Sequence, residues 1–205
     1  MFDDTYKTIL ERAEGLFKDK GSRFIGLAYP VKSETEVKEI LAEIKKKYYD
    51  ATHHCYAYYM GHIGSPSIRM NDDGEPSGTA GKPIYGQILS FGLKNVLVVV
   101  IRYFGGTKLG VSGLINAYKE TAKMTLQNAK IEERKIKDIY EIEFAYPLMN
   151  AAMQVLKNEA ISIKNTSYQG DNVVIRFEVV WTKKEEICQQ FRNIYGVKQL
   201  YISTV

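Results

Sequence analysis

The chain has 205 residues, of which 45% are hydrophobic and 25% charged, a composition typical of a globular protein with one large or two small domains. Its longest apolar run, Val96–Ile101, is too short to cross a bilayer, and no secretory signal is visible, so we expect a cytoplasmic protein without a membrane partner. The distant Cys55 and Cys188 argue against a disulfide scaffold and against a zinc ribbon.

The net charge of +4 is too small to indicate a nucleic-acid partner by itself, but its distribution is uneven. Residues 1–130 contain 18 Lys and Arg against 14 Asp and Glu, whereas residues 131–205 contain 10 of each. The whole surplus of four therefore lies in the N-terminal part. Any electrostatic attraction for phosphate is expected there.

The first 130 residues alternate between strand and helix patterns. Ser33 is a typical helix cap, with Glu36 completing a capping box and the basic residues 45–47 suiting the negative end of the helix dipole. The pattern predicts strands over Thr5–Leu16, Arg23–Val31, His53–Met60 and Asn95–Tyr103, and helices over Ser33–Lys47, Pro83–Phe91 and Leu109–Ala129.

A charge-rich segment, residues 131–137, separates this part from a second unit and is interpreted as a linker. The order of elements after it is strand, helix, strand, strand, helix, strand. That order is the ferredoxin-like βαββαβ arrangement, in which two helices pack on one face of an antiparallel sheet. We therefore expect an α+β protein with an N-terminal domain over 1–130, a linker over 131–137 and a ferredoxin-like domain over 138–205.

Two polar loops punctuated by glycine flank the apolar run of the N-terminal part. Glycine is placed where the backbone needs a positive φ or a close approach, so six glycines in two loops indicate loops shaped for a task. The loops read Asn-Asp-Asp-Gly-Glu-Pro-Ser-Gly-Thr-Ala-Gly over residues 71–81 and Arg-Tyr-Phe-Gly-Gly-Thr-Lys-Leu-Gly over residues 102–110.

Together with Gly113-Leu114-Ile115-Asn116-Ala117-Tyr118, these loops resemble the signature of the YigZ/IMPACT family. Residues 20–25 and 51–58 resemble the family's opening strand and its Ala-Thr-His-x-Cys segment. The chain departs from the family pattern at His54, Tyr56 and Ser112, and none of these departures removes a charged residue of the signature. The chain is thus identified as similar to the two-domain, bacterial-type members.

The resemblance implies both fold and function. It implies an N-terminal IMPACT-type domain like the mixed α+β fold of domain 2 of a small-subunit ribosomal protein, and a C-terminal domain like a terminal domain of elongation factor G. It also implies a non-catalytic, RNA- or ribosome-associated regulator of translation, because the IMPACT branch is linked to competition for an activator of a starvation-responsive translation kinase. A protein partner in translation control is expected on the same ground.

The residues themselves leave several interpretations of the loops open. Ser77, Gly78 and Thr79 precede the expected start of a helix and suggest a loose anion nest, or else a loop shaped only to turn tightly between strand and helix. Ser77, Thr79 and Lys82 are the candidate binding residues, although the Walker spacing is absent and Pro83 lacks an N–H. Asp72, Asp73 and Glu75 suggest magnesium binding or acid–base chemistry, or else a conformational role in which they pair with Arg102 or Lys108 or accept backbone N–H bonds.

His53, His54 and His62 beside Cys55 suggest a metal site or a Cys/His nucleophile. Strand geometry favours a packed thiol instead, because His53 and Cys55 share one face of a strand while His54 lies on the other. We therefore expect no metal site and no cofactor.

The loop after the apolar run combines cations with aromatic rings, the groups that hold a nucleic-acid backbone and stack on bases. Its candidate binding residues are Arg102, Tyr103, Phe104 and Lys108. Tyr103 and Phe104 are also compatible with the end of a core strand, in which case only the cations face water. An enzyme, a hydrolase or transferase that uses both loops, and a protein-interaction adaptor remain the alternatives to the regulator.

Overall fold

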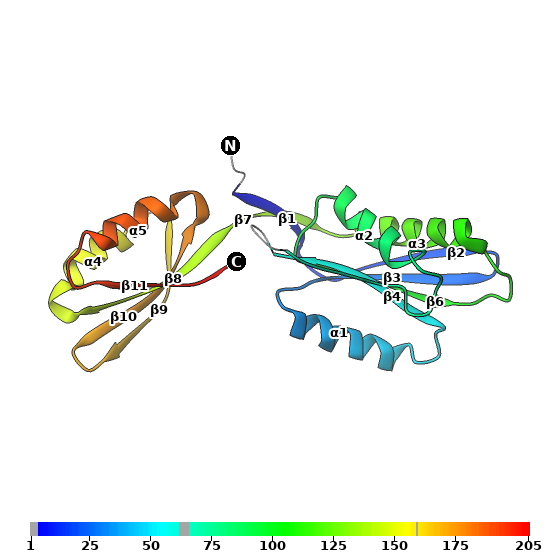
Figure 1. Ribbon diagram of the computed structural model, residues 1–205, viewed down its shortest axis with the longest axis horizontal. Helices are drawn as coiled ribbons and strands as arrows, with labels where there is room; N and C mark the ends of the chain where they lie inside the picture. Colours follow the sequence, from blue (N-terminus) through cyan, green and yellow to red (C-terminus); the bar gives the residue numbers. More distant parts are fainter. Residues whose placement is uncertain (1–3, 62–65, 159) are drawn as a thin grey trace. The chain divides into compact units, whose positions relative to one another are not determined.

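A computed structural model describes residues 4–61, 66–158 and 160–205 (Figure 1). The chain divides into two compact units. One is Tyr6–Glu133, and the other combines Met1–Thr5 with Arg134–Val205. None of the helices in the described ranges is both long and apolar enough to cross a membrane.

A five-stranded antiparallel sheet forms the centre of the first unit. Its central strand β6 is the predicted apolar strand, and the burial of all but its last residue confirms that prediction. The strand order across the sheet is β2 (Ala13–Asp19), β3 (Ser22–Pro30), β6 (Val96–Tyr103), β4 (His53–Met60) and β5 (Ser67–Asn71).

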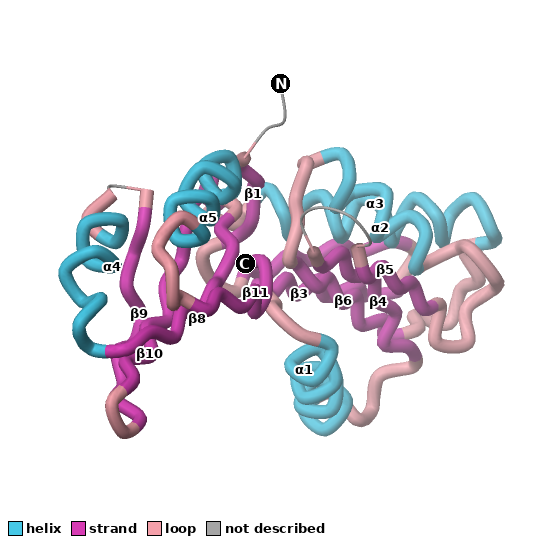
Figure 2. Tube along the Cα trace, turned by 60° about the vertical axis from the view of Figure 1, so that its left-hand side comes forward, coloured by secondary structure: helices cyan, strands magenta, loops and turns pink. Residues whose placement is uncertain are grey.

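Helices cover both faces of this sheet (Figures 1 and 2). Helix α1 (Glu34–Lys47) lies on one face, and α2 (Gly81–Ser90) and α3 (Gly110–Gln127) lie on the other. Successive residues of a strand point to opposite faces, so β6 contributes to two cores. Val96, Val98 and Val100 pack under α2 and α3, whereas Leu97, Val99 and Ile101 pack against α1.

The start of α1 follows the sequence prediction with one difference. The Ser33 hydroxyl accepts a hydrogen bond from the Glu36 N–H at 3.2 Å, as expected of a helix cap. The Glu36 carboxylate accepts from the N–H of Lys32, one residue before the cap, rather than from Ser33 itself. The cap is confirmed, and the reciprocal bond is displaced by one residue.

Two strands of the first unit differ from the expectation. The single strand predicted over 5–16 is two strands, β1 (Thr5–Ile9) and β2, because β1 leaves the main sheet and pairs with β7 (Ile131–Lys135). Strand β5 lies within a segment expected to be loop. It is a short edge strand with little burial, so the alternation that marks a half-buried strand is missing from its sequence.

The segment expected to be a linker, residues 131–137, contains β7 and the first residue of β8. The division into compact units falls within β7, between Glu133 and Arg134, and it assigns Met1–Thr5 to the C-terminal unit. Strand pairing with β1 therefore gives the segment a regular structure that its high charge does not suggest. The domain boundary of 130–138 stays a prediction.

The C-terminal unit has the ferredoxin-like arrangement predicted from the order of its elements. The sheet order β11-β8-β10-β9 is antiparallel throughout, and both helices pack on one face (Figure 2). The elements are β8 (Lys137–Ala145), α4 (Met149–Leu156), β9 (Ile161–Gln169), β10 (Asn172–Val180), α5 (Lys184–Arg192) and β11 (Lys198–Thr204), with 3-10 turns over Tyr146–Leu148 and Trp181–Lys183.

Candidate functional site

The two glycine-punctuated loops meet at one end of the five-stranded sheet. Strand β4 begins there and β6 ends there, with His53 directly opposite Arg102 in the ladder. The first loop, residues 72–80, connects β5 to α2, and the second, residues 104–109, connects β6 to α3 (Figure 1). The fold thus brings together two segments that lie some thirty residues apart in sequence.

Asp72 organises the first loop through backbone hydrogen bonds. One carboxylate oxygen accepts from the N–H of Gly78 at 2.8 Å, and the other accepts from Ala80 at 3.0 Å and Gly81 at 2.8 Å. Desolvation by burial opposes ionisation, but the bonds from Gly78, Gly81 and Ala80 outweigh it, so the pKa of Asp72 lies below its ordinary value. The carboxylate acts as an internal anion at the start of α2.

This arrangement bears on the anion nest expected at Ser77, Gly78 and Thr79 and on the candidate binding residue Lys82. The N–H groups of Gly78, Ala80 and Gly81 already have Asp72 as their acceptor. Thr79 is buried and donates its hydroxyl to the carbonyl of Pro76 at 2.7 Å. Only Ser77 and Lys82 present their side chains to solvent.

Asp73 fixes the first loop to β4. Its own φ of 42° is in the left-handed region, and the side chain of Asn71 accepts a hydrogen bond from its N–H. Its carboxylate accepts from the N–H of His54 at 2.7 Å, and Lys45 of α1 lies 3.6 Å away. Its carbonyl oxygen is 2.7 Å from Nδ1 of His53. Asp73 therefore has structural partners on three sides.

Glu75 joins the first loop to the end of β6 through a buried ion pair. Its Oε1 accepts from a terminal guanidinium nitrogen of Arg102 at 2.6 Å and from the hydroxyl of Tyr118 at 2.7 Å, with Nε2 of His53 at 3.8 Å. Both side chains of the ion pair are more than nine-tenths buried. Glu75 thus compensates the charge of Arg102, which is the conformational alternative predicted for the acidic residues.

Aromatic rings surround the guanidinium of Arg102. Its central carbon lies 5.4 Å from the ring centroid of Phe24 and 5.5 Å from that of Phe104. Its Nε is buried and has no hydrogen-bond partner among the residues that the structure describes. Arg102 therefore contributes to the interior, and it does not project into solvent as a phosphate-binding residue would.

Cys55 completes the buried polar cluster beneath the loops. Its thiol is 2.9 Å from the carbonyl oxygen of Asp72 and 3.3 Å from the hydroxyl of Tyr118. Burial raises the pKa of the Cys55 thiol far above its ordinary value, and the neighbouring carboxylates add to that effect. A neutral thiol is a poor nucleophile, so this geometry agrees with the packed-thiol interpretation.

The orientation of the histidines follows the strand periodicity predicted from the sequence. His53 shares the α2 and α3 face with Cys55, whereas Nε2 of His54 reaches the carbonyl oxygen of Tyr48 at the end of α1. His62 lies outside the described residues. Among the described residues, no group of three His, Cys, Asp or Glu is arranged to hold a metal ion.

Glycine shapes the second loop by close backbone contact. A Cβ placed on Gly105 would lie 1.9 Å from the carbonyl carbon of Gly21, so the loop crosses the β2–β3 turn at a distance that only glycine permits. The N–H of Gly105 also donates to the hydroxyl of Ser22 at 3.2 Å. Phe104 and Lys108 are exposed on this loop, and Lys108 forms no ion pair with any described residue.

The four candidate residues at the end of β6 and in the second loop therefore separate into three environments. Arg102 faces the interior under α2 and α3, and Tyr103 lies on the opposite face of the sheet. There the Tyr103 ring packs against the guanidinium of Arg23 and its hydroxyl donates to Asp50 at 2.8 Å. Phe104 and Lys108 face solvent. We call the exposed side chains of Ser77, Lys82, Phe104 and Lys108 the loop surface.

The sequence interpretation missed the role of Tyr118, which it names only as the last residue of a stretch that resembles the family signature. A buried tyrosine usually finds a hydrogen-bond partner for its hydroxyl, and that rule is the signal that points to this site. The hydroxyl donates to Glu75, and burial raises the pKa of Tyr118 far above its ordinary value. Tyr118 therefore remains a neutral donor.

Comparisons with known proteins agree with this geometry. Residues 20–126, just over half of the chain, match the profile of the Impact N-terminal domain. The chain is 36% identical over 184 residues to the IMPACT family member YvyE of Bacillus subtilis (strain 168), covering 88% of this chain and 82% of that protein. It is 31% identical over 151 residues to the IMPACT family member YigZ of Escherichia coli (strain K12), covering 73% and 74%.

The likeness extends to the fold of the whole chain. A crystal structure of a hypothetical protein matches with a TM-score of 0.73 and 25% identity, covering 98% of this chain and 99% of that one. The resemblance identified from the loop motifs is confirmed by the profile match and by relatives that align over most of their length. The chain belongs to the IMPACT family.

Proposed function

We propose that this protein is a non-catalytic regulator of translation that associates with RNA or the ribosome through the loop surface. The observation that carries the proposal is the exposed Lys108, which forms no ion pair within the described ranges and lies on a loop that makes a close backbone contact at Gly105. A cation held on a rigid loop and open to solvent is suited to a phosphate of a nucleic-acid backbone. Membership of the IMPACT family supports translation as the process that the protein regulates, because the family resemblance described above implies a role in translational control.

The enzyme alternative has less support from the geometry. The acidic residues that would carry the chemistry have structural partners: Asp72 binds three N–H groups, and Glu75 compensates the buried charge of Arg102. A general base must reach the proton that it removes, and these carboxylates are occupied within the fold. We therefore favour binding over catalysis as the task of the loops.

The partner contact is assigned to the exposed side chains alone. Lys108 and Lys82 supply charge, and Phe104, which is 48% exposed, supplies a ring face for an unpaired base. Arg102 is excluded from direct contact because it is buried against Glu75. This assignment narrows the candidate set obtained from the sequence.

The decisive experiment compares Lys108→Ala with Lys32→Ala in the full chain. Lys32 is also exposed, but it lies beyond the opposite end of β3, away from the loops. Binding to a mixed-sequence, single-stranded RNA is measured by fluorescence anisotropy at several salt concentrations. We expect Lys108→Ala to lower the slope of log affinity against log salt by about 0.7, the value for one phosphate contact on a single strand.

The control should keep both the affinity and the slope of the unmodified protein. If Lys108→Ala melts normally and leaves affinity and slope unchanged, the loop surface does not contact RNA phosphate. Sedimentation of the same variants with ribosomes over the same salt series tests whether the loop surface binds the ribosome. A different result would favour the adaptor alternative. In that case the chain does not bind RNA, but it binds a protein partner with an affinity that does not depend on salt and that Phe104→Ala abolishes.

A further inference from the structure

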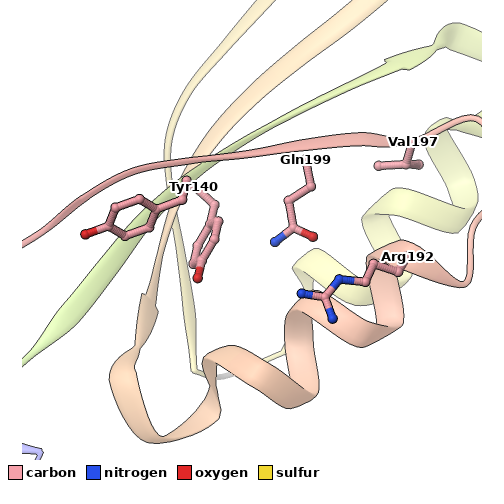
Figure 3. Close-up of a pocket in the computed structure, with 5 residues that line it drawn as sticks. Tyr140, Arg192, Val197 and Gln199 are labelled. Atoms are coloured by element: carbon pink, nitrogen blue, oxygen red, sulfur yellow. The ribbon is translucent and has the colours of Figure 1, made fainter.

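A pocket of about 420 Å³ lies in the C-terminal unit, between β11 and α5. Figure 3 shows Gln199 projecting from β11 into the space between Tyr140 and Arg192. Its size is within the range of sites that bind small ligands. The residues that line it are Tyr140, Arg192, Val197, Gln199 and Tyr201.

One wall of the pocket is the end of a row of aromatic rings. Phe191 packs on Phe177 at 5.3 Å between centroids, Phe177 stacks with Tyr140 at 6.0 Å, and Tyr140 meets Tyr201 edge to face at 5.6 Å. Phe177 is fully buried, whereas Tyr201 at the sheet edge is 51% exposed. The row thus leaves an aromatic surface uncovered where the pocket opens, which suits a planar ring.

Gln199 provides a hydrogen-bond acceptor without a partner. Its Nε2 donates to Sγ of Cys188 at 2.7 Å, which fixes the amide. Its Oε1 is buried and accepts no hydrogen bond from any residue that the structure describes. A buried acceptor left unsatisfied is unfavourable, so a ligand N–H or O–H at this position would gain from it.

Arg192 brings a positive charge to the pocket from α5. One terminal nitrogen of its guanidinium contacts Glu185 at 3.2 Å and Gln189 at 3.3 Å, and both contacts are exposed. Figure 3 shows the guanidinium turned toward the space beneath Gln199. Exposed contacts of this kind are weak, so the remaining donors suit an anionic group on a ligand.

We propose that this pocket binds a nucleotide, with the base against Tyr201, a base N–H donating to Oε1 of Gln199 and the phosphate at Arg192. A planar ring with N–H donors and an attached anion combines the three features that the pocket complements. Free mononucleotides and a nucleotide within an RNA strand share this chemistry. The site is independent of the loop surface, because none of its residues belongs to the N-terminal unit.

The test titrates the full chain with adenosine and cytidine monophosphates, with the matching nucleosides, and with a short single-stranded RNA, using calorimetry. Tyr201→Ala should weaken nucleotide binding about tenfold through lost stacking. Gln199→Met, which keeps the length but removes the acceptor, should weaken it roughly fivefold. Tyr168→Ala is the matched control, because Tyr168 is an exposed tyrosine on β9 outside the pocket.

A second comparison isolates the phosphate. Arg192→Ala should weaken the monophosphate but leave the nucleoside unchanged. Binding of the RNA without binding of any mononucleotide assigns the nucleotide to a strand, and the reverse result assigns it to a free ligand. The proposal is overturned if neither form binds, or if Tyr201→Ala and Gln199→Met melt normally and bind as tightly as the unmodified chain. Lys108→Ala should leave mononucleotide binding intact. A failure of the proposed nucleotide pocket can therefore be distinguished from a failure of the proposed loop surface.

Discussion

The two loops at the end of the five-stranded sheet are both rich in glycine, but their polar side chains have opposite surroundings. In the loop over residues 72–80, Asp72 accepts from N–H groups of the loop and of Gly81 in α2, Asp73 accepts from His54, and Glu75 accepts from Arg102. In the loop over residues 104–109, backbone contacts at Gly105 set the path, and Lys108 faces solvent without an ion pair to a described residue. The first loop uses its charges for structure, and the second leaves its charge available.

This difference separates residues that hold the site from residues that are free to bind. A polar side chain that satisfies buried groups of its own fold is costly to remove, whereas an exposed one can be replaced with little effect on stability. Substitutions in the first loop should therefore act on folding. Substitutions at Lys108 should act on binding alone.

The largest effect is expected for Glu75→Leu, which leaves the buried guanidinium of Arg102 without its counter-ion. Removing one partner of a buried ion pair typically costs about 3–5 kcal/mol of unfolding free energy. Urea denaturation measures the loss. Adding Arg102→Met removes the unpaired charge and should recover at least half of it, whereas a double variant as unstable as the single one would contradict the ion-pair account.

Gly105→Ala should cause the second-largest loss of stability. The new Cβ would lie 1.9 Å from the carbonyl carbon of Gly21, and neither backbone segment can move without a cost in free energy. We expect a loss of about 3 kcal/mol, in the range for overpacked sites. Gly106→Ala is the matched control: it has a φ of +87° but open space around it, so only backbone strain of about 1 kcal/mol applies. Equal melting temperatures for the two variants would show that the contact between Gly105 and the β2–β3 turn is not rigid.

The order of elements and the family were predictable from the sequence, because hydrophobic periodicity and glycine placement are local signals. The face shared by His53 and Cys55 was predictable for the same reason. The donor role of Tyr118 was not, since α3 is far from Glu75 in sequence and only the fold brings them together. The β7 strand and the pocket at Gln199 likewise depend on tertiary pairing.

Asp72→Asn should cost about 2 kcal/mol at neutral pH, because charged hydrogen bonds to three N–H groups are replaced by a neutral amide. The pKa of Asp72 in the folded chain lies below its ordinary value of 3.8. Its stabilisation is therefore fully present above that value and is lost as the pH falls through the lower, folded-state pKa. The difference between the two proteins should shrink on acidification. A difference that is constant down to pH 2 would exclude the lowered pKa of Asp72 in the folded chain.

The smallest effect on stability is expected for Lys108→Ala. The side chain is exposed and forms no ion pair with the part of the chain described, and substitutions at such positions usually change the unfolding free energy by less than about 0.5 kcal/mol. Thermal and urea melts check this value. A loss above about 1 kcal/mol would mean that Lys108 has a structural role like Glu75, and any change in RNA affinity could no longer be attributed to a lost contact. An unchanged melt with a reduced salt slope is the result that only a binding residue gives, because a structural residue would lower stability and affinity together.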